Sequence, residues 1–285
     1  MSVWTARRVI AFAHQGGSFE GPSSTLAAIE HALRVGASAI ELDVHATSDR
    51  RIVVCHDDTV DATTNHHGEI ASLTLAELRS MDNAYWWIEG ETVTPGREER
   101  AYQLRGRAPS DRRYGVATLE EVATTFPGVL LNLDLKRTSP EVEAYESLLY
   151  DDLRRLEITD AVMVASFHDE AIQRFRALAP GVATSAATNE VAAFYFSLGD
   201  ASPAVPPVEA FQVPARFSGI DVVTPAFIDA AHRADVAVHV WTINDEVEMT
   251  RLLDLSVDGL VSDRPTPLAA LLGERGCAWD GRLGA

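Results

Sequence analysis

Two short apolar runs of the chain carry charged residues at alternate positions. Glu41 and Asp43 lie in the first run, and Asp134 and Lys136 lie at the end of the second. Successive side chains of a strand point to opposite faces, so we expect each pair to leave its strand on one side. Three carboxylates converging from two strands would form an oxygen-rich site for one divalent cation, Mg²⁺ or Ca²⁺, which would neutralise their buried charge. A rim of acids paired with arginine is the alternative interpretation.

Two of the nine histidines also end apolar runs. His14 follows Ala11-Phe12-Ala13 and precedes two glycines, which allow a ligand to approach the backbone closely. His56 stands directly before two aspartates. Two imidazoles supply an acid and a base that work near neutral pH, as phosphoester cleavage beside a metal requires.

Lysine is nearly absent from the chain. Lys136 is the one lysine among 24 basic residues, and the others are arginine. A composition this poor in lysine suggests that position 136 needs a lysine for its chemistry, and chance survival on the surface is the alternative.

These residues sit in a regular alternation of extended and helical patterns, which predicts parallel βα units. Helical patterns cover 25–35, 119–125, 140–156, 169–179, 225–234 and 246–255. Extended patterns cover 9–13, 39–44, 52–56, 129–135, 161–166, 182–186, 219–223, 236–242 and 259–262.

One of the nine extended candidates cannot be a parallel strand. Only seven residues, HATSDRR, separate Val44 from Ile52, and a parallel crossover needs about a dozen. The run 52–56 must therefore return antiparallel, as a hairpin arm at the barrel mouth. Eight parallel strands remain, and they predict an α/β fold, a (β/α)8 TIM barrel in a single domain over residues 1–285. An open doubly wound sheet is the alternative.

Two stretches interrupt this rhythm. Residues 57–118 are too long for a structureless loop, so we expect a cap insertion at the barrel mouth. Six of its arginines fall within 17 residues and could form a phosphate-attracting rim, or a solvated loop face: Arg97, Arg100, Arg105, Arg107, Arg112 and Arg113. The proline-rich stretch 202–214 is expected to be a rigid connection.

Charge and composition exclude several classes of protein. A net charge of −18 argues against binding nucleic acid or an anionic membrane. No apolar run reaches the roughly 18 residues of a transmembrane helix, and the apolar run after Arg7 and Arg8 is too short for a signal peptide. Two cysteines form no disulfide framework. We therefore expect a cytoplasmic enzyme, whose oligomeric state these observations leave open.

The motifs, taken in order, resemble those of the glycerophosphodiester phosphodiesterase family over about residues 8–267. The ordered set is specific, although each motif alone is weak. It includes His14-Gln15-Gly16, Pro22-Ser23-Ser24-Thr25, Glu41-Leu42-Asp43-Val44, His56-Asp57, Leu73-Thr74-Leu75-Ala76-Glu77-Leu78, Thr118-Leu119-Glu120-Glu121-Val122, Asp134-Leu135-Lys136, Ser166-Phe167, Val240-Trp241-Thr242-Ile243-Asn244 and Asp258-Gly259-Leu260-Val261-Ser262-Asp263-Arg264-Pro265.

The resemblance implies a barrel like that of phosphatidylinositol-specific phospholipases C, which would hydrolyse glycerophosphodiesters to glycerol 3-phosphate and an alcohol. It also implies roles for the candidate residues. His14 and His56 would be the acid–base pair, Glu41, Asp43 and Asp134 would hold the divalent cation, and Lys136 would stabilise charge on the phosphate, with Gln15 beside it. Trp241 could contact the glycerol, or it could be a core tryptophan.

This chain departs from the family pattern at three positions. Gln15 replaces the usual arginine after the first histidine, so we expect weaker phosphate binding unless the insertion's arginines assist. Ser23 replaces a glutamate whose function Glu20 could recover, and Asp134 is one methylene shorter than the usual glutamate.

Two other functions remain open. Tyr85, Trp86 and Trp87 could form an apolar slot for a lysophospholipase D-like activity on lipid substrates, or they could simply pack. The departures at Gln15 and Ser23 also allow a catalytically silent ligand-binding barrel.

Overall fold

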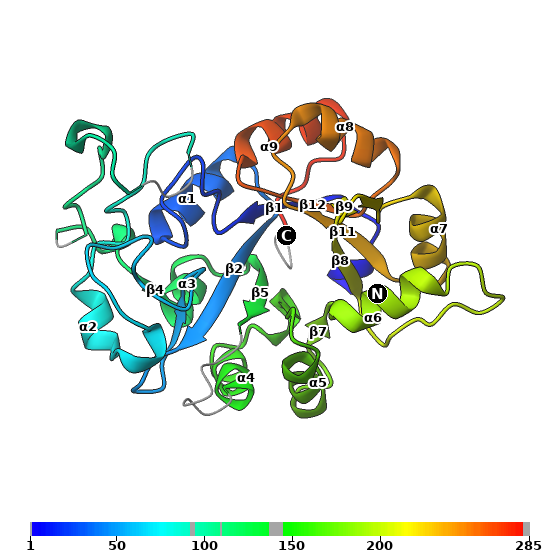
Figure 1. The fold of residues 1–285 in the computed structure, drawn as a ribbon, viewed down its shortest axis with the longest axis horizontal. Coiled ribbons are helices and arrows are strands. Elements are labelled where there is room, and N and C mark those ends of the chain that lie inside the picture. Colours follow the sequence, from blue (N-terminus) through cyan, green and yellow to red (C-terminus); the bar gives the residue numbers. More distant parts are fainter. Residues whose placement is uncertain (1, 92–94, 109, 137–144, 282–285) are drawn as a thin grey trace.

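The computed structural model describes residues 2–91, 95–108, 110–136 and 145–281 and contains a ring of eight parallel strands (Figure 1). Along the sheet the order is β7-β6-β5-β2-β1-β12-β11-β8, and a parallel bridge between Ser185 and Ala210 joins the two ends. The predicted (β/α)8 barrel is thereby confirmed. The strands are β1 (Ile10–His14), β2 (Ala39–Ala46), β5 (Leu130–Leu135), β6 (Val162–Ala165), β7 (Ala183–Thr184), β8 (Ala210–Pro214), β11 (Ala237–Trp241) and β12 (Gly259–Ser262).

Helices surround this ring, and side-chain caps fix where several of them begin. The hydroxyls of Thr25, Thr118 and Thr224 each accept a hydrogen bond from the backbone N–H three residues later. The helices are α1 (Leu26–Val35), α2 (Leu75–Arg79), α3 (Leu119–Thr125), α4 (Glu146–Arg155), α5 (Asp169–Leu178), α6 (Thr188–Phe196), α7 (Pro225–Arg233), α8 (Glu246–Asp254) and α9 (Pro265–Glu274). The predicted helices are found close to their expected bounds, except that residues 140–144 lie outside the described part of the chain.

The strands alternate between two buried faces. Ile40, Leu42 and Val44 of β2 pack in one apolar cluster with helix residues such as Ile29 and Phe175. Phe12, Leu130, Met163 and Val261 belong to a separate cluster built from the opposite strand face. Because side chains alternate along a strand, the second face is the barrel interior, and His14, Glu41, Asp43 and Asp134 share it.

Gly259 of β12 lies where the barrel interior leaves no room for a side chain. A Cβ at this position would lie 2.8 Å from Phe12 Cε2 and 2.8 Å from His239 Cδ2, both in the buried interior. We expect Gly259→Ala to lower the free energy of unfolding by about 2 kcal/mol, because overpacking displaces both rings. Urea denaturation measures the change. Gly181→Ala, where a Cβ would meet nothing within 4 Å, is the control, and an equal effect in both variants would contradict the packing argument.

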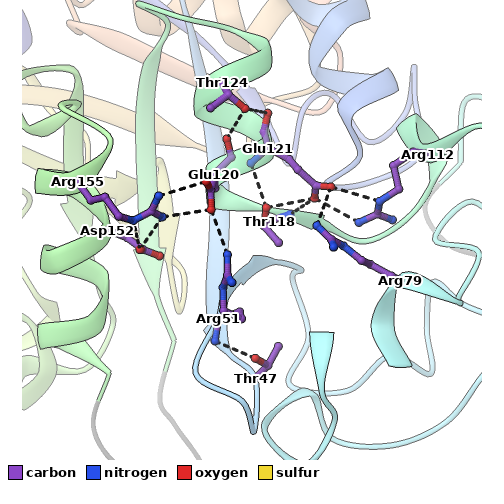
Figure 2. A network of polar contacts seen from close by, with 10 residues as sticks. All are labelled: Thr47, Arg51, Arg79, Arg112, Thr118, Glu120, Glu121, Thr124, Asp152 and Arg155. Carbon is purple, nitrogen blue, oxygen red and sulfur yellow. Dashed lines mark hydrogen bonds and ion pairs between the residues drawn. The ribbon is translucent and has the colours of Figure 1, made fainter. Parts of the chain in front are cut away.

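The predicted hairpin arm is also confirmed. Strand β3 (Ile52–Val54) pairs antiparallel with β2, and β4 (Ala117–Thr118) pairs antiparallel with β3. Helix α3 follows β4 directly. As Figure 2 shows, its first-turn acids Glu120 and Glu121 bind arginines from four different segments, namely Arg51, Arg79, Arg112 and Arg155.

Residues 57–116, hereafter the insertion, have a small apolar core of their own. Val60, Ile70 and Leu78 are fully buried there with Val53 of β3. Four of the six arginines considered for a phosphate rim form ion pairs with acids, which favours the solvated-face interpretation. These ion pairs are Arg97–Glu91, Arg100–Glu98, Arg112–Glu121 and Arg113 with Asp111 and Glu30.

Two expectations about residues 202–223 were wrong. The stretch interpreted as a rigid connection contains barrel strand β8, in which Pro214 is the last residue and interrupts no ladder. The run 219–223 is no barrel strand. Ser218 and Gly219 both have positive φ, so the chain turns sharply and β9 (Arg216–Phe217) pairs antiparallel with β10 (Ile220–Asp221).

Among the described residues, no helix is both long enough and apolar enough to cross a membrane.

Candidate active site

The loop between β1 and α1, residues 15–25, turns sharply at the carboxyl end of β1. Gln15, Gly16 and Gly17 all have left-handed backbone conformations, with φ of +53°, +81° and +90°. A Cβ on Gly17 would lie 2.7 Å from Pro265, so glycine is required there for space as well as for conformation. The turn directs the backbone N–H of Gln15 to Glu41 Oε2, at 3.1 Å.

His14 lies between two carboxylates. Its Nδ1 is 2.7 Å from Asp263 Oδ1, and its Nε2 is 3.8 Å from Glu41 Oε2. Burial disfavours the imidazolium ion, but Glu41 and Asp263 outweigh burial and raise the pKa of His14 to about 9. The same contact, against the opposing effect of burial, lowers the pKa of Asp263.

The carboxylates predicted as metal ligands lie side by side. His14 is in register with Glu41 across β1 and β2, and Asp43 is in register with Asp134 across β2 and β5. Lys136 Nζ lies 2.7 Å from Asp43 Oδ1 and 2.8 Å from Asp134 Oδ2. Burial raises the pKa of Glu41 and of Asp134, and the neighbouring Asp43 raises both further. One ammonium therefore balances only part of the charge of three buried carboxylates.

The donor chemistry of these residues fits a hard divalent cation. Asp43 Oδ2 and Asp134 Oδ1 are buried and have no hydrogen-bond partner within the described chain. Unpaired carboxylate oxygens in such a place are costly unless a cation binds them. Nevertheless, across residues 2–91, 95–108, 110–136 and 145–281 no three His, Cys, Asp or Glu side chains already stand in a coordinating arrangement. Lys136 lies between two of the predicted ligands instead.

The second histidine faces the same site from the hairpin arm. The rings of His14 and His56 are 6.4 Å apart between centroids and nearly perpendicular. His56 Nδ1 lies 2.7 Å from Asp57 Oδ1, and this hydrogen bond raises the pKa of His56 while that of Asp57 falls. The two imidazoles, the three carboxylates and the ammonium thus meet in one place.

No role was predicted for Asp263, which lies in the motif Ser262-Asp263-Arg264-Pro265 directly after the last predicted strand. Asp263 Oδ1 accepts a hydrogen bond from Ser18 Oγ at 2.5 Å, and Oδ2 accepts one from Asn244 Nδ2 at 2.7 Å. The only available signal was the position of Asp263 directly after a strand, since its partners lie 245 and 19 residues away in sequence.

The two departures from the family pattern near His14 contact each other. Ser23 Oγ donates to Gln15 Oε1 at 2.6 Å, and both side chains are buried. A neutral hydrogen bond therefore occupies the positions where the family pattern has an arginine and a glutamate. Glu20 does not recover the missing carboxylate, because it binds His31 and the backbone N–H of Thr266 in α9.

Trp241 ends β11 and packs edge-to-face against Phe167, with ring centroids 5.5 Å apart. The aromatic residues of the insertion are used in packing. Trp87 is buried and donates to Ser18 O at 2.8 Å, and Trp86 contacts the rings of Tyr85 and Tyr102. These contacts favour the packing interpretation over an apolar slot.

Comparison with known proteins shows which family this chain resembles. The sequence model of the glycerophosphoryl diester phosphodiesterase family matches residues 14–266. A Bacillus altitudinis glycerophosphodiester phosphodiesterase is 28% identical over 89% of this chain and 94% of its own length. A probable glycerophosphodiester phosphodiesterase 2 of Mycobacterium tuberculosis is 31% identical over 95% and 93%. An Oleispira antarctica phosphodiesterase, solved with its product sn-glycerol-3-phosphate, shares the fold with a TM-score of 0.70, at 21% identity over 95% of this chain and 99% of that one.

Because the family match spans nearly the whole barrel and contains every residue of the site, this chain belongs to the glycerophosphoryl diester phosphodiesterase family.

Proposed function

We propose that this protein hydrolyses glycerophosphodiesters to glycerol 3-phosphate and an alcohol. The observation that carries the proposal is the meeting of His14, His56 and Lys136 beside three buried carboxylates at the carboxyl ends of the strands. Relatives from B. altitudinis and M. tuberculosis are named for the same activity, which supports the proposal.

The two histidines would share the proton transfers. As the glycerol 2-hydroxyl attacks phosphorus, one imidazole accepts its proton and the other protonates the departing alcohol, leaving a cyclic phosphate. Water then opens the cyclic phosphate with the two roles reversed. The ammonium of Lys136 would stabilise negative charge on the phosphoryl oxygens, and Gln15 and Trp241 would contact the phosphate and the glycerol.

Glu41, Asp43 and Asp134 would hold one divalent cation, Mg²⁺ or Ca²⁺. The unpaired buried oxygens of Asp43 and Asp134, and the excess of carboxylate charge over the ammonium of Lys136, support this assignment. When bound, the cation would supply Lewis-acid polarisation of the hydroxyl and the phosphate.

Removal of the cation tests the proposed function. We expect a chelator to lower the cleavage of glycerophosphocholine at least about 10³-fold, and added Mg²⁺ or Ca²⁺ to restore it. Release of choline and glycerol 3-phosphate is measured, with heat-inactivated protein as the blank. Full activity in chelator would overturn the cation assignment, and binding without any turnover would leave the silent barrel as the function.

Lysophospholipids are a second candidate substrate class, favoured by apolar side chains at the catalytic end of the barrel. Phe167, Phe217, Ile220 and Val247 follow β6, β8 and β11 and are 49% to 78% exposed. Assaying lysophosphatidylcholine beside glycerophosphocholine decides between the classes, because faster cleavage of the lipid would identify a lysophospholipase D-like enzyme.

A single domain over residues 1–285, a cytoplasmic location and the absence of nucleic-acid binding stay predictions.

A further inference from the structure

The insertion contacts the site region through the loop at residues 15–25. Between β1 and α1 this loop forms turns and no regular secondary structure. Backbone hydrogen bonds within the loop, such as Gly21 N to Gly17 O and Ser24 N to Gln15 O, close these turns, and contacts from the insertion add to them. The insertion donates three hydrogen bonds to its backbone carbonyls, which are Trp87 Nε1 to Ser18 O at 2.8 Å, Gly90 N to Phe19 O at 2.8 Å and Asn83 Nδ2 to Ser23 O at 3.1 Å.

Two of the residues held in this way contact the site with their side chains. Ser18 Oγ donates to Asp263 Oδ1 at 2.5 Å, and Asp263 Oδ1 also lies 2.7 Å from His14 Nδ1. Ser23 Oγ donates to Gln15 Oε1 at 2.6 Å. Ser18 and Ser23 therefore each contact the site through the side-chain hydroxyl and accept a hydrogen bond from the insertion at the backbone carbonyl.

Asp263 is the point where these contacts meet His14. Both of its oxygens accept hydrogen bonds, from Ser18 and from Asn244, and Asp263 is 7% exposed. An acceptor fixed at Nδ1 sets the orientation of the imidazole, so Nε2 is the nitrogen that faces Glu41 and the site. Any shift of Asp263 moves that nitrogen, and misplacement of a reacting group by about 1 Å can cost 10²-fold in rate.

We propose that the insertion braces the catalytic centre, with Asp263 as the residue that positions His14 and Trp87 as the residue that holds Asp263 in place through Ser18. This inference rests on the proposed function, in which His14 transfers a proton. It assigns the long insertion a role in catalysis without any contact between insertion and substrate.

Three variants test the brace. Asp263→Asn should lower kcat on glycerophosphocholine about 10²- to 10³-fold, because an amide cannot accept at both positions. Trp87→Phe keeps an aromatic side chain, with a smaller ring, but removes the N–H donor, and we expect kcat to fall about 3- to 10-fold with KM changed less than about twofold. Trp86→Phe is the matched control, since Trp86 lies in the same segment and contacts Tyr85, Tyr102 and Arg105 instead.

The double variant separates a positioning role from a structural one. If Trp87 acts through Asp263, Trp87→Phe should lower kcat less than about twofold in the Asp263→Asn background. The same 3- to 10-fold loss in both backgrounds, or a kcat unchanged by Trp87→Phe, would overturn the proposal.

A readout without turnover keeps the brace testable if the proposed activity fails. The Nδ1 proton of His14, assigned by its loss in His14→Gln, should give a hydrogen-bonded NMR resonance in the wild type and in Trp86→Phe. It should vanish in Asp263→Asn and shift in Trp87→Phe. An unshifted resonance in Trp87→Phe would contradict the brace even in a protein that cleaves no glycerophosphodiester.

Discussion

Replacing His14 with alanine is expected to lower kcat on glycerophosphocholine about 10³-fold, because a positioned acid or base contributes on the order of 10²- to 10⁴-fold. The variant should stay folded. Asp263, the buried partner of His14, keeps its hydrogen bonds from Ser18 and Asn244, so no unpaired carboxylate is created. Steady-state kinetics at saturating cation measure kcat, and thermal unfolding shows whether the variant stays folded.

His56→Ala should produce a loss of similar size, since the two imidazoles face each other at 6.4 Å and would exchange roles between the two steps. His66→Ala provides the control, because His66 is an exposed histidine of the insertion. A loss below about tenfold in either active-site variant would exclude that histidine as the acid or base.

Lys136→Met is expected to lower both the stability of the protein and its activity. Lys136 Nζ binds Asp43 Oδ1 and Asp134 Oδ2, and both carboxylates are buried. Without the ammonium, the buried carboxylates of Asp43 and Asp134 lose their cationic partner, and we expect the cation-free protein to lose about 3 kcal/mol of unfolding free energy. Activity should fall about 10²-fold, because the phosphoryl oxygens lose a charged donor.

The cation dependence of this variant gives the sharper result. A divalent cation would replace the missing positive charge, so Mg²⁺ or Ca²⁺ should raise the melting temperature of Lys136→Met more than that of the wild type. Lys136→Arg is the matched variant that keeps the charge. It should recover stability but not activity, since a planar guanidinium cannot take the place of a compact ammonium. Equal cation-induced shifts in wild type and Lys136→Met would contradict a shared site.

Strand patterns predicted much of the site, because alternation along a strand is a local property. Glu41 and Asp43 had to share a face, and the seven-residue gap before Ile52 could hold only a hairpin. The carboxyl ends of parallel strands lie at one end of a barrel, so the meeting of Asp134 with Asp43 followed from the fold class. The strand at 210–214 was missed because prolines lie before it and at its end, and because its apolar residues are few and interrupted by Gln212.

By itself the sequence determined the alternation of strands and helices outside residues 202–223, the barrel fold and the strand faces that carry the site, since these depend on periodicity and on short connections. Only the tertiary structure decided which side chains pair across long separations. The contact of His14 with Asp263 joins the first and last barrel strands, and Trp87 reaches Ser18 across 69 residues. The pairing of Ser23 with Gln15 and of the insertion's arginines with acids likewise depends on rotamers and loop turns. No local pattern encodes such contacts, because their free energy arises only when separate segments are packed together.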